Sequence, residues 1–435
     1  MKTINVGICG LGTVGAGVVN VMQRNMAAIA ARSGREVSIT HIGARRDNPA
    51  CDVGSATVSR DIFAVVNDPN VDVVVELIGG YEPALELVMQ AIANGKHVVT
   101  ANKALIAMHG NEIFAAAEER GVSVLFEAAV AGGIPIIKAM REGLAANSIE
   151  WLAGIINGTG NYILTEMRDK GRQFDDVLAD AQQLGYAEAD PTFDVEGIDA
   201  AHKLVILASL AFAMPLNFDA CFTEGISAIA PQDVVFAGEL GYRIKHLGIA
   251  RKGEQGVEMR VHPTLIPQRR LIANVDGVMN AVLVNGDAVG PTLYYGAGAG
   301  AEPTASSVIA DIVDVVRTID ADPISRVPAL GVSQKSLSAL PVLPISEVNT
   351  AYYLRINVSD QPGVLSHITQ ILSDSDISIE AVLQKEVVQQ ESAVVPVVLI
   401  TNRTLESQFV AAVKRIEALE AVQENVHFIR VESLG

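Results

Sequence analysis

Thr3-Ile-Asn-Val-Gly-Ile-Cys9 leads directly into Gly10-Leu-Gly12-Thr-Val-Gly15, and this stretch decides the fold of the N-terminal part of the chain. The residues before Gly10 are typical of a short buried strand, and the glycine spacing is that of a Rossmann-type dinucleotide-binding turn. In that turn the first glycine allows the tight bend, the second lets the backbone approach a pyrophosphate, and the third allows close helix packing. These glycines, with Thr13 and Val14 at the start of the helix, are therefore predicted to bind the pyrophosphate of a dinucleotide.

Alternating strands and helices continue to about residue 135. Strand patterns cover 37–42, 71–78 and 122–126, and helical patterns cover 14–31, 82–94 and 110–120. This alternation predicts a parallel, doubly wound α/β sheet. We expect residues 1–135 to form a Rossmann-type nucleotide-binding domain.

The end of the second predicted strand reads Ile42-Gly-Ala-Arg45-Arg46, without an acidic residue before Asp47. An Asp or Glu at this point would bind the ribose 2′-hydroxyl of NAD, whereas arginine can bind the 2′-phosphate of NADP. Arg45 and Arg46 thus favour NADP. NAD stays as the alternative cofactor, and a solvated surface pair is the interpretation without a cofactor role.

Two further segments are predicted to contact the cofactor. Thr100 and Lys103 follow a short apolar strand, and ligands bind beyond the carboxyl ends of strands in open α/β sheets. Gly300 lies in the stretch 296–301, Gly-Ala-Gly-Ala-Gly-Ala, where small residues let the backbone approach a ligand. A flexible turn before the next helix is the alternative there.

The densest polar stretch runs from Gly185 to Lys203 and contains Glu188, Asp194 and Asp199. Asp199 and Lys203 are four residues apart at the start of an apolar helical pattern, so they lie on one face of that helix. A lysine that enters an apolar environment can have a lowered pKa, which suits proton transfer. A surface ion pair that opens a helix is the alternative, and the histidine beside Lys203 is interpreted as structural.

The rest of the chain predicts two more domains. Residues 136–325 mix helical and strand patterns and are assigned to an α+β substrate-binding and dimerisation domain, with its last helix, 304–319, free to pack back on the nucleotide-binding domain. Residues 326–350 are rich in proline and serine, which predicts a linker. Over 351–435 a βαββαβ order predicts a ferredoxin-like domain.

Composition excludes several classes of protein. The 435 residues suit about three domains, and the net charge of −18, without a Lys/Arg-rich block, argues against nucleic-acid binding. Three cysteines without a CxxC motif argue against a disulfide framework and for a reducing compartment. Since no signal-peptide pattern and no apolar run of membrane-spanning length are present, we expect a cytoplasmic protein that does not contact a membrane.

Four stretches together resemble homoserine dehydrogenase: GLGTVG at 10–15, TANKAL at 100–105, GIINGTGNYIL at 154–164 and GYAEADPTFDVEGIDAAHK at 185–203. The sequence YYLRINVSDQPGVLSHI at 352–368 resembles an ACT domain, as in the long monofunctional members of that family. The resemblance covers essentially the whole chain. It implies NAD(P)-dependent interconversion of L-homoserine and L-aspartate 4-semialdehyde in threonine, methionine and isoleucine biosynthesis.

The resemblance also implies roles for single residues. Lys203 would be the acid/base, and Glu188, Asp199 and Asp194 would bind homoserine. Lys103 would lie where cofactor and substrate meet, and Gly185 would lie on the cofactor side. The chain departs from the family's GTTNYI pattern at Gly160, where a threonine hydroxyl is missing.

The family binds a monovalent cation near the end of the nucleotide-binding domain. Here Glu127 and the backbone carbonyls of Val130, Gly132 and Ile134 offer an oxygen-only set that suits sodium. Without the resemblance, this stretch would be interpreted as a glycine-rich hinge.

The ACT-like domain implies regulation. The turn Asp360-Gln-Pro-Gly363 places free backbone amides at the start of a predicted helix, where the carboxylate of an amino acid can bind. L-threonine is the expected effector, and dimerisation without regulation is the alternative. A homodimer or homotetramer is expected.

Two other functions are weighed against this one. A phosphorylating semialdehyde dehydrogenase needs a nucleophilic cysteine, but Cys9, Cys51 and Cys221 lie in no recognisable activating motif. A non-catalytic sensor would combine a dinucleotide-binding domain with an amino-acid-binding one. Turnover of homoserine with NADP separates these alternatives.

Overall fold

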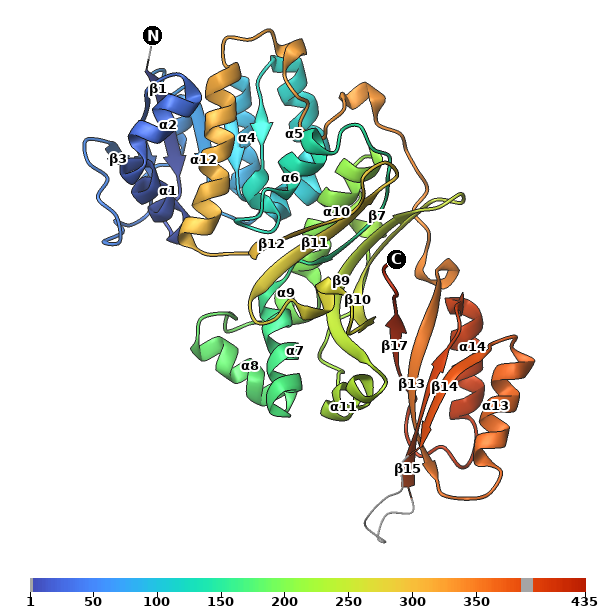
Figure 1. Cartoon of the computed structure of the whole chain (residues 1–435). Coiled ribbons are helices and arrows are strands. Elements are labelled where there is room, and N and C mark those ends of the chain that lie inside the picture. Colours follow the sequence, from blue (N-terminus) through green and yellow to red (C-terminus); the bar gives the residue numbers. More distant parts are fainter. Residues whose placement is uncertain (1–2, 385–393) are drawn as a thin grey trace.

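A computed structural model describes residues 3–384 and 394–435 and contains three regions along the chain (Figure 1). The first is a six-stranded parallel sheet in the order β3-β2-β1-β4-β5-β6. This is the strand order of a classic dinucleotide-binding fold, so the predicted Rossmann-type class is confirmed. Its strands are β1 (Ile4–Cys9), β2 (Val37–Gly43), β3 (Thr57–Ser59), β4 (Val73–Glu76), β5 (His97–Thr100) and β6 (Val124–Leu125).

Helices cover both faces of this sheet, since apolar side chains alternate along each strand. One face packs against α1 (Thr13–Arg24), α2 (Met26–Ser33) and α12 (Ala301–Thr318), and the other against α3 (Phe63–Asn67), α4 (Ala84–Ala93) and α5 (Lys103–Arg120). The single helix expected over 14–31 is wrong, because the chain breaks at Asn25 into α1 and α2. β3 and α3 are too short to have shown a periodic pattern.

The helix predicted at 304–319 is α12, and it packs on the nucleotide-binding region. Val308 and Ile312 of α12 are buried with Val18 and Met22 of α1. Gly17 permits this approach, because a Cβ there would lie 2.4 Å from the carbonyl oxygen of Ala301. In Figure 1 the orange α12 lies beside α1 although nearly 300 residues separate them in the chain.

The middle region is an antiparallel sheet in the order β12-β11-β7-β9-β10 with helices against it. The strands are β7 (Ile149–Ile155), β9 (Tyr242–Lys252), β10 (Val257–Pro267), β11 (Met279–Gly286) and β12 (Gly290–Ala297), with the short β8 (Phe222–Thr223) beside β10. The helices are α6 (Ile136–Lys138), α7 (Gly158–Lys170), α8 (Phe174–Gln183), α9 (Thr192–Val195), α10 (Ile198–Phe212) and α11 (Pro231–Glu239). The sequence predicts strands near 149–156 and 257–265 and helices near 161–170, 175–184 and 196–213, and these correspond to β7, β10, α7, α8 and α10. β9, β11, β12 and α11 were not predicted.

The C-terminal region has the predicted ferredoxin-like arrangement. Its strands lie in the order β17-β13-β15-β14, and two helices cover one face. The elements are β13 (Asn349–Ser359), α13 (Val364–Asp374), β14 (Ile379–Gln384), β15 (Val394–Thr401), β16 (Thr404–Leu405), α14 (Glu406–Glu417) and β17 (His427–Val431). β17 also pairs in parallel with β10, so one continuous sheet joins the middle and C-terminal regions.

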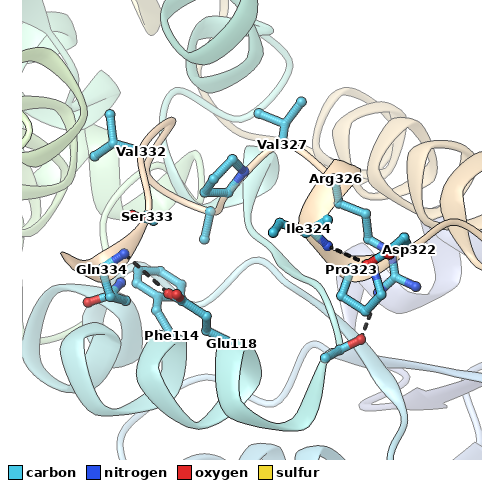
Figure 2. Close-up of a pocket in the computed structure, with 13 residues that line it drawn as sticks. Phe114, Glu118, Asp322, Pro323, Ile324, Arg326, Val327, Val332, Ser333 and Gln334 are labelled. Atoms are coloured by element: carbon cyan, nitrogen blue, oxygen red, sulfur yellow. Dashed lines mark hydrogen bonds between the residues drawn. The ribbon is translucent and has the colours of Figure 1, made fainter. Parts of the chain in front are cut away.

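The stretch predicted as a linker, 326–350, is irregular but packed. Val257 of β10 donates its amide to Pro341 and accepts from the amide of Leu343. A cavity of about 400 Å³ lies between α5 and residues 322–334, with Phe114 and Glu118 on one wall (Figure 2). Within the parts of the chain that are described, no helix is long and apolar enough to cross a bilayer.

Candidate functional site

A buried cluster of charged side chains lies at the start of α10. The carboxylate of Asp199 bridges two lysines: Lys203 Nζ lies 2.6 Å from Oδ2, and Lys103 Nζ lies 3.1 Å from Oδ1. Lys203 also donates to the backbone carbonyl of Ile156 at 2.7 Å. The i, i+4 spacing brings Asp199 and Lys203 together, whereas Lys103 arrives from the N-terminus of α5 in the nucleotide-binding region. Two regions of the fold thus meet at one carboxylate.

Asn157 organises the acidic side of this cluster and was not predicted. Its side-chain amide donates to Asp194 at 2.7 Å and to Asp199 at 2.9 Å, while its oxygen caps α7 by accepting from the amide of Gly160. The sequence signal that could have found it is the Asn-Gly step directly after β7, a helix N-cap at the end of a strand. Through Asn157 the N-terminus of α7 fixes both carboxylates.

Burial and charge set the pKa values in the cluster. Burial lowers the pKa of Lys203, and the carboxylate of Asp199 partly opposes this. Although burial alone would raise it, the two lysines hold the pKa of Asp199 below its ordinary value. Asp199 raises the pKa of Lys103, and burial raises the pKa of Asp194. Lys203 is therefore the lysine that loses its proton more easily.

Glu188, the remaining residue predicted to bind substrate, and Gly185, predicted to lie on the cofactor side, come from the segment after α8. Glu188 is exposed, and its charge contributes to the raised pKa of Lys103, so its side chain faces the same region. Gly185 is exposed with a φ of +74° in the loop after α8. Thr159 donates its hydroxyl to the carbonyl of Tyr186 at 2.6 Å. At Gly160, where the family has threonine, a Cβ would lie 3.4 Å from Asn157 Oδ1, which is tight but not excluded.

His202 is packed between rings rather than placed among the charges. It stacks on Phe193 and Phe218 with centroid distances of 6.2 and 4.5 Å, and Nε2 lies 3.4 Å from the hydroxyl of Tyr81. Burial lowers its pKa to about 4, so the ring is neutral at pH 7. This environment agrees with the interpretation of a structural histidine.

The glycines of the first turn have the geometry that a dinucleotide requires. Gly10 has a φ of +108°, and a Cβ at Gly15 would lie 2.2 Å from the carbonyl oxygen of Gly10. A Cβ at Gly12, in contrast, would meet nothing within 4 Å, so this position faces open space in front of the helix. α1 has neither a side-chain cap nor an acidic residue in its first turn, where Thr13 and Val14 lie. The uncapped amides fit a pyrophosphate.

The arginines predicted to bind the 2′-phosphate are exposed at the end of β2. Arg45 and Arg46 follow the buried Ala44. Arg60, which was not predicted, reaches the same place from the end of β3, where it donates to the carbonyl of Ala44 at 3.1 Å and pairs with Asp47 at 2.8 Å. Only the parallel pairing of β2 with β3 brings Arg60 there, so its sequence position carried no signal.

Thr100 has a structural partner that was not predicted. Its hydroxyl donates at 2.6 Å to Glu76, a fully buried residue whose other oxygen accepts the amides of Ile78 and Gly79. Asn102 continues the network by donating to the carbonyl of Gly80. Glu76 therefore ties together the loops after β4 and β5, on which Lys103 depends for its position.

The segment predicted to bind a cation lies against the loop before α12. Both oxygens of the buried Glu127 accept backbone amides, from Ile137 at 2.8 Å and Lys138 at 2.7 Å. The carbonyl of Gly132 accepts the hydroxyl of Ser307 at 2.7 Å, and that of Ile134 accepts the amide of Ile136 at 2.8 Å. Carboxylate and carbonyl oxygens can each accept more than one partner, so the set fits a cation as a further ligand.

Gly300 and Val130 flank this segment. Gly300 precedes α12 with a φ of +127°, which favours glycine, and Val130 is buried directly after the turn Glu127–Ala129. In the described ranges, no group of three His, Cys, Asp or Glu side chains could hold a metal ion. A cation at this place would depend on backbone carbonyls.

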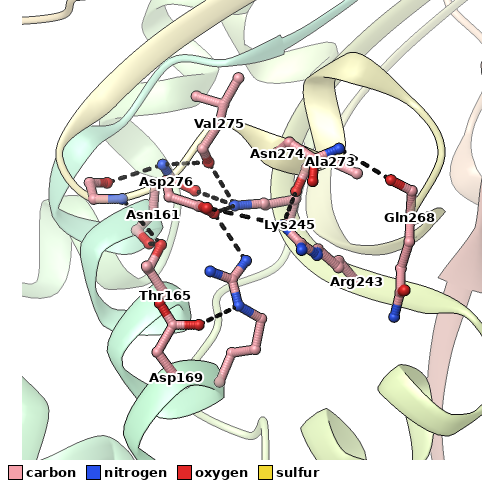
Figure 3. A network of polar contacts seen from close by, with 12 residues as sticks. Asn161, Thr165, Asp169, Arg243, Lys245, Gln268, Ala273, Asn274, Val275 and Asp276 are labelled. Atoms are coloured by element: carbon pink, nitrogen blue, oxygen red, sulfur yellow. Dashed lines mark hydrogen bonds and ion pairs between the residues drawn. The ribbon is translucent and has the colours of Figure 1, made fainter.

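A second buried lysine, Lys245, contacts α7 through Asn161 (Figure 3). Lys245 of β9 is 1% exposed and donates to Asn161 Oδ1 at 3.1 Å, Val275 O at 2.5 Å and Asp276 Oδ1 at 3.1 Å. Asn161 in turn donates to the carbonyls of Val275, Gly277 and Met279. The network holds the loop before β11 against α7, one turn from Asn157.

The cysteines do not support a thiol nucleophile. Burial raises the pKa of Cys9 and of Cys51, and raises that of Cys221 to about 12. Thiols of this kind are protonated at pH 7 and are poor nucleophiles. The phosphorylating alternative therefore lacks its central residue.

Comparisons with known proteins agree along the whole chain. The NAD binding domain of homoserine dehydrogenase matches residues 10–127, the homoserine dehydrogenase domain matches 135–313, and the ACT domain matches 352–421. A homoserine dehydrogenase of Pseudomonas aeruginosa is 64% identical over 100% of both chains. A crystal structure of a homoserine dehydrogenase from Thiobacillus denitrificans is 62% identical with a TM-score of 0.95, covering 100% of this chain and 99% of that one.

A more distant solved structure is a hyperthermophilic archaeal homoserine dehydrogenase in complex with NADPH. It is 25% identical with a TM-score of 0.60 and covers 72% of this chain and 97% of its own. Since matches of one family cover the nucleotide-binding, middle and C-terminal regions, and relatives of that name match the full length, the chain belongs to the homoserine dehydrogenase family, in the form that carries a C-terminal ACT domain.

Proposed function

We propose that Lys203 is the acid/base of this NAD(P)-dependent oxidoreductase. The single observation that carries the proposal is the buried contact between Lys203 and Asp199, joined from the nucleotide-binding region by Lys103. A bound nicotinamide supplies the hydride acceptor or donor. The chain supplies the proton transfer through Lys203, a buried base that shares the carboxylate of Asp199 with Lys103 of the nucleotide-binding region.

In the oxidative direction, neutral Lys203 accepts the proton of the homoserine hydroxyl. In the reductive direction, protonated Lys203 returns a proton to the oxygen of the aldehyde as it becomes an alcohol. Asp199 orients the lysine, and with Asp194 and Glu188 provides negative charge for the substrate's ammonium group. Lys103 neutralises part of that negative charge, and the ammonium group of the zwitterionic substrate neutralises more of it.

We propose NADP as the preferred cofactor, with NAD as the weaker one. Arg45, Arg46 and Arg60 gather positive charge at the end of β2, where the carbonyl of Ala44 and the carboxylate of Asp47 hold Arg60. The complex of the archaeal relative with NADPH supports the same choice. We place Thr100, Gly185 and Gly300 around the cofactor as backbone contacts, because Thr100 already uses its hydroxyl for Glu76.

We propose further that a monovalent cation, sodium by its preference for oxygen ligands, binds Glu127 and the carbonyls of Val130, Gly132 and Ile134. Burial raises the pKa of Glu127, and a nearby cation would lower it again. The cation's part is structural: it would hold the segment after β6 in place beside the cofactor loop.

The C-terminal domain is proposed to bind L-threonine as a regulatory ligand at the turn Asp360–Gly363. α13 begins at Val364, after the N-cap residue Gly363, without a side-chain cap or an acidic residue in its first turn, which suits a carboxylate. A homo-oligomer, a cytoplasmic location and the division at 1–135, 136–325, 326–350 and 351–435 also stay predictions.

One experiment tests the core of the proposal. Purified enzyme is assayed for oxidation of L-homoserine with NADP and with NAD, with and without sodium, and then with increasing L-threonine. Turnover that is faster with NADP supports the cofactor assignment. If threonine leaves the rate unchanged, or if it inhibits the G363V variant as strongly as the parent enzyme, the effector site is not at this turn. K414A, at an exposed position of α14, is the control variant in the same domain.

A further inference from the structure

His246 of β9 is a buried histidine that lies against both helix starts of the catalytic cluster. A Cβ at Gly160, in the first turn of α7, would lie 3.6 Å from its Nδ1. A Cβ at Gly197, the residue directly before α10, would lie 3.0 Å from its Cε1. The imidazole ring therefore packs against the start of α7 and the start of α10 at the same time.

One nitrogen of this ring is hydrogen-bonded and the other is not. Nε2 lies 2.9 Å from the carbonyl oxygen of Glu224, and since a carbonyl only accepts, Nε2 carries the proton. Nδ1 is buried without a hydrogen-bond partner among the residues that the structure describes. Burial lowers the pKa of His246 to about 4, against the opposing effects of the Glu224 carbonyl and the charge of Glu196. The ring is therefore neutral at pH 7, and it acts on the two helices by packing rather than by charge.

The catalytic pair depends on the separation of these two helix starts. Lys203 of α10 donates to the carbonyl of Ile156, which lies just before α7. In the opposite direction, Asn157 at the N-cap of α7 donates to Asp199 of α10 at 2.9 Å. A shift of one helix start relative to the other would lengthen both contacts together. The geometry of Lys203 and Asp199 is thus fixed only while the two helix starts stay in place.

We propose that His246 is a positioning residue that keeps the starts of α7 and α10 at the separation that Lys203 and Asp199 require. The absence of side chains at Gly160 and Gly197 leaves the space for its ring, and the carbonyl of Glu224 orients the ring in that space. A displacement of about 1 Å at a reacting group can lower a rate by about a hundredfold, so packing at this place affects turnover. The inference rests on the proposed role of Lys203 as the acid/base.

The first test removes the ring and then restores most of it. In H246A, kcat for homoserine oxidation should fall by roughly 10- to 100-fold, because the catalytic pair is no longer held in register. The dissociation constant for reduced NADP, measured by fluorescence, should stay that of the parent. H246Q retains a donor for the Glu224 carbonyl and much of the volume, so it should restore most of the parent kcat.

The second test is the dependence of kcat on pH. Burial lowers the pKa of Lys203, while the charges of Asp199, Lys103 and Asp194 around it do not change with the substitution. In H246A water enters beside the cluster, so this pKa should rise and the increase of activity should move to higher pH. His246 itself is neutral across the assay range and does not contribute to the profile.

Controls separate positioning from a general loss of packing. L247A truncates the next residue of β9, which is fully buried in a separate apolar cluster with Ile249 and Ile266. It should lower the melting temperature as H246A does, yet keep the parent kcat and pH profile. H246N, whose side chain is too short to pack against both helices, serves if H246A does not fold.

Two results would overturn the proposal: a parent-like kcat and pH profile in H246A or H246N, or equal losses of kcat in H246A and L247A. An increase of activity with pH that persists in K203M would instead refute the proposed acid/base. In that case the comparison of kcat between H246A and L247A would still decide whether His246 positions the cluster.

Discussion

At the scale of single residues, proton transfer depends on how Lys203 is placed relative to charge. Burial lowers its pKa, and Asp199 limits the decrease while orienting the amine. Lys103 shares the same carboxylate but is 40% exposed, and its pKa is raised. The two lysines that share the carboxylate therefore differ in protonation: Lys203 can lose its proton, and Lys103 stays charged.

Replacing Lys203 by methionine should lower kcat for homoserine oxidation by roughly 10²–10⁴, the usual contribution of general acid–base catalysis. Parent activity should rise with pH through the lowered pKa of Lys203, because only the neutral amine accepts a proton, and this rise should vanish in K203M. Steady-state kinetics across pH measure kcat and its dependence on pH. Fluorescence measures whether the variant still binds the cofactor. K96M replaces a buried lysine of the nucleotide-binding region that donates to Asp68 and Val71, and it should retain kcat. Near-normal turnover in K203M would exclude the lysine as acid/base.

Arg45 and Arg60 should bind the 2′-phosphate of NADP. Each substitution by alanine should raise KM for NADP by about tenfold to a hundredfold, because a charge-assisted hydrogen bond contributes about 1.5–3 kcal/mol. KM for NAD should change far less. Parallel assays with the two cofactors measure the difference, and R415A on α14 is the control. Equal losses with NADP and NAD would show that these arginines do not contact the phosphate.

At the scale of elements, the position of α7 depends on a network that the helix itself does not contain. Asn157 caps its N-terminus and holds two carboxylates, while Lys245 and Asp276 hold its inner face through Asn161. Burial lowers the pKa of Lys245 to about 8, so a positive charge is kept there at some cost in stability.

Lys245 should make stability depend on pH above neutrality. Between pH 8 and 10.5 this lysine is protonated in the unfolded chain but not in the folded chain. The free energy of unfolding therefore increases as the pH rises through this range. The gain should reach up to about 3 kcal/mol across the window. Urea unfolding of parent and K245M at several pH values isolates the contribution as a difference. A difference that stays constant from pH 8 to 10.5 would contradict the lowered pKa.

At the scale of the whole molecule, the ACT domain packs against the catalytic domain rather than being joined to it by a flexible linker alone. β17 extends the sheet through β10, and buried ion pairs cross the junction. Arg430 of β17 pairs with Glu224 of the middle region as well as with Glu406 of its own domain, and Arg260 of β10 lies 2.5 Å from Glu432. A truncation after Asn349 would leave Arg260, which is 1% exposed, without this partner. Point substitutions in the full chain are therefore the better test of regulation.

The contact between Asp233 of α11 and Arg355 of β13 should dominate the stability of this junction. The carboxylate accepts from Arg355 Nε at 2.7 Å and from the hydroxyl of Tyr353 at 3.0 Å, and all three residues are buried. D233A should lower the free energy of unfolding by about 3–5 kcal/mol, because an unpaired charge stays buried. The double variant D233A/R355M should recover most of the loss. Thermal and urea unfolding measure both, and a loss in the double variant as large as in D233A would contradict this account.

Local chemistry made much of the fold predictable. A strand followed by glycines at fixed spacing, apolar residues alternating every second position, and Asp199 four residues before Lys203 are all properties of a short stretch of chain. The doubly wound class of the nucleotide-binding region and the βαββαβ succession of the C-terminal region follow from such stretches. β9 and β11 were not predicted because polar residues such as Lys245 and Asn280 are buried in them and mask the alternation. β12 has no buried residue, so its sequence shows no alternation of buried and exposed positions.

By itself, the sequence determined the Rossmann-type turn, the family, the ACT domain and the pairing of Asp199 with Lys203, because each depends on residues close together in the chain. Only the tertiary structure decided what converges on them from a distance. Lys103, Asn157, Glu76 and Arg60 each come from a different strand or helix end, and β17 of the C-terminal domain joins β10 of the middle one. Such contacts depend on which strands lie side by side, and that choice is made by burial over the whole chain rather than by any local pattern.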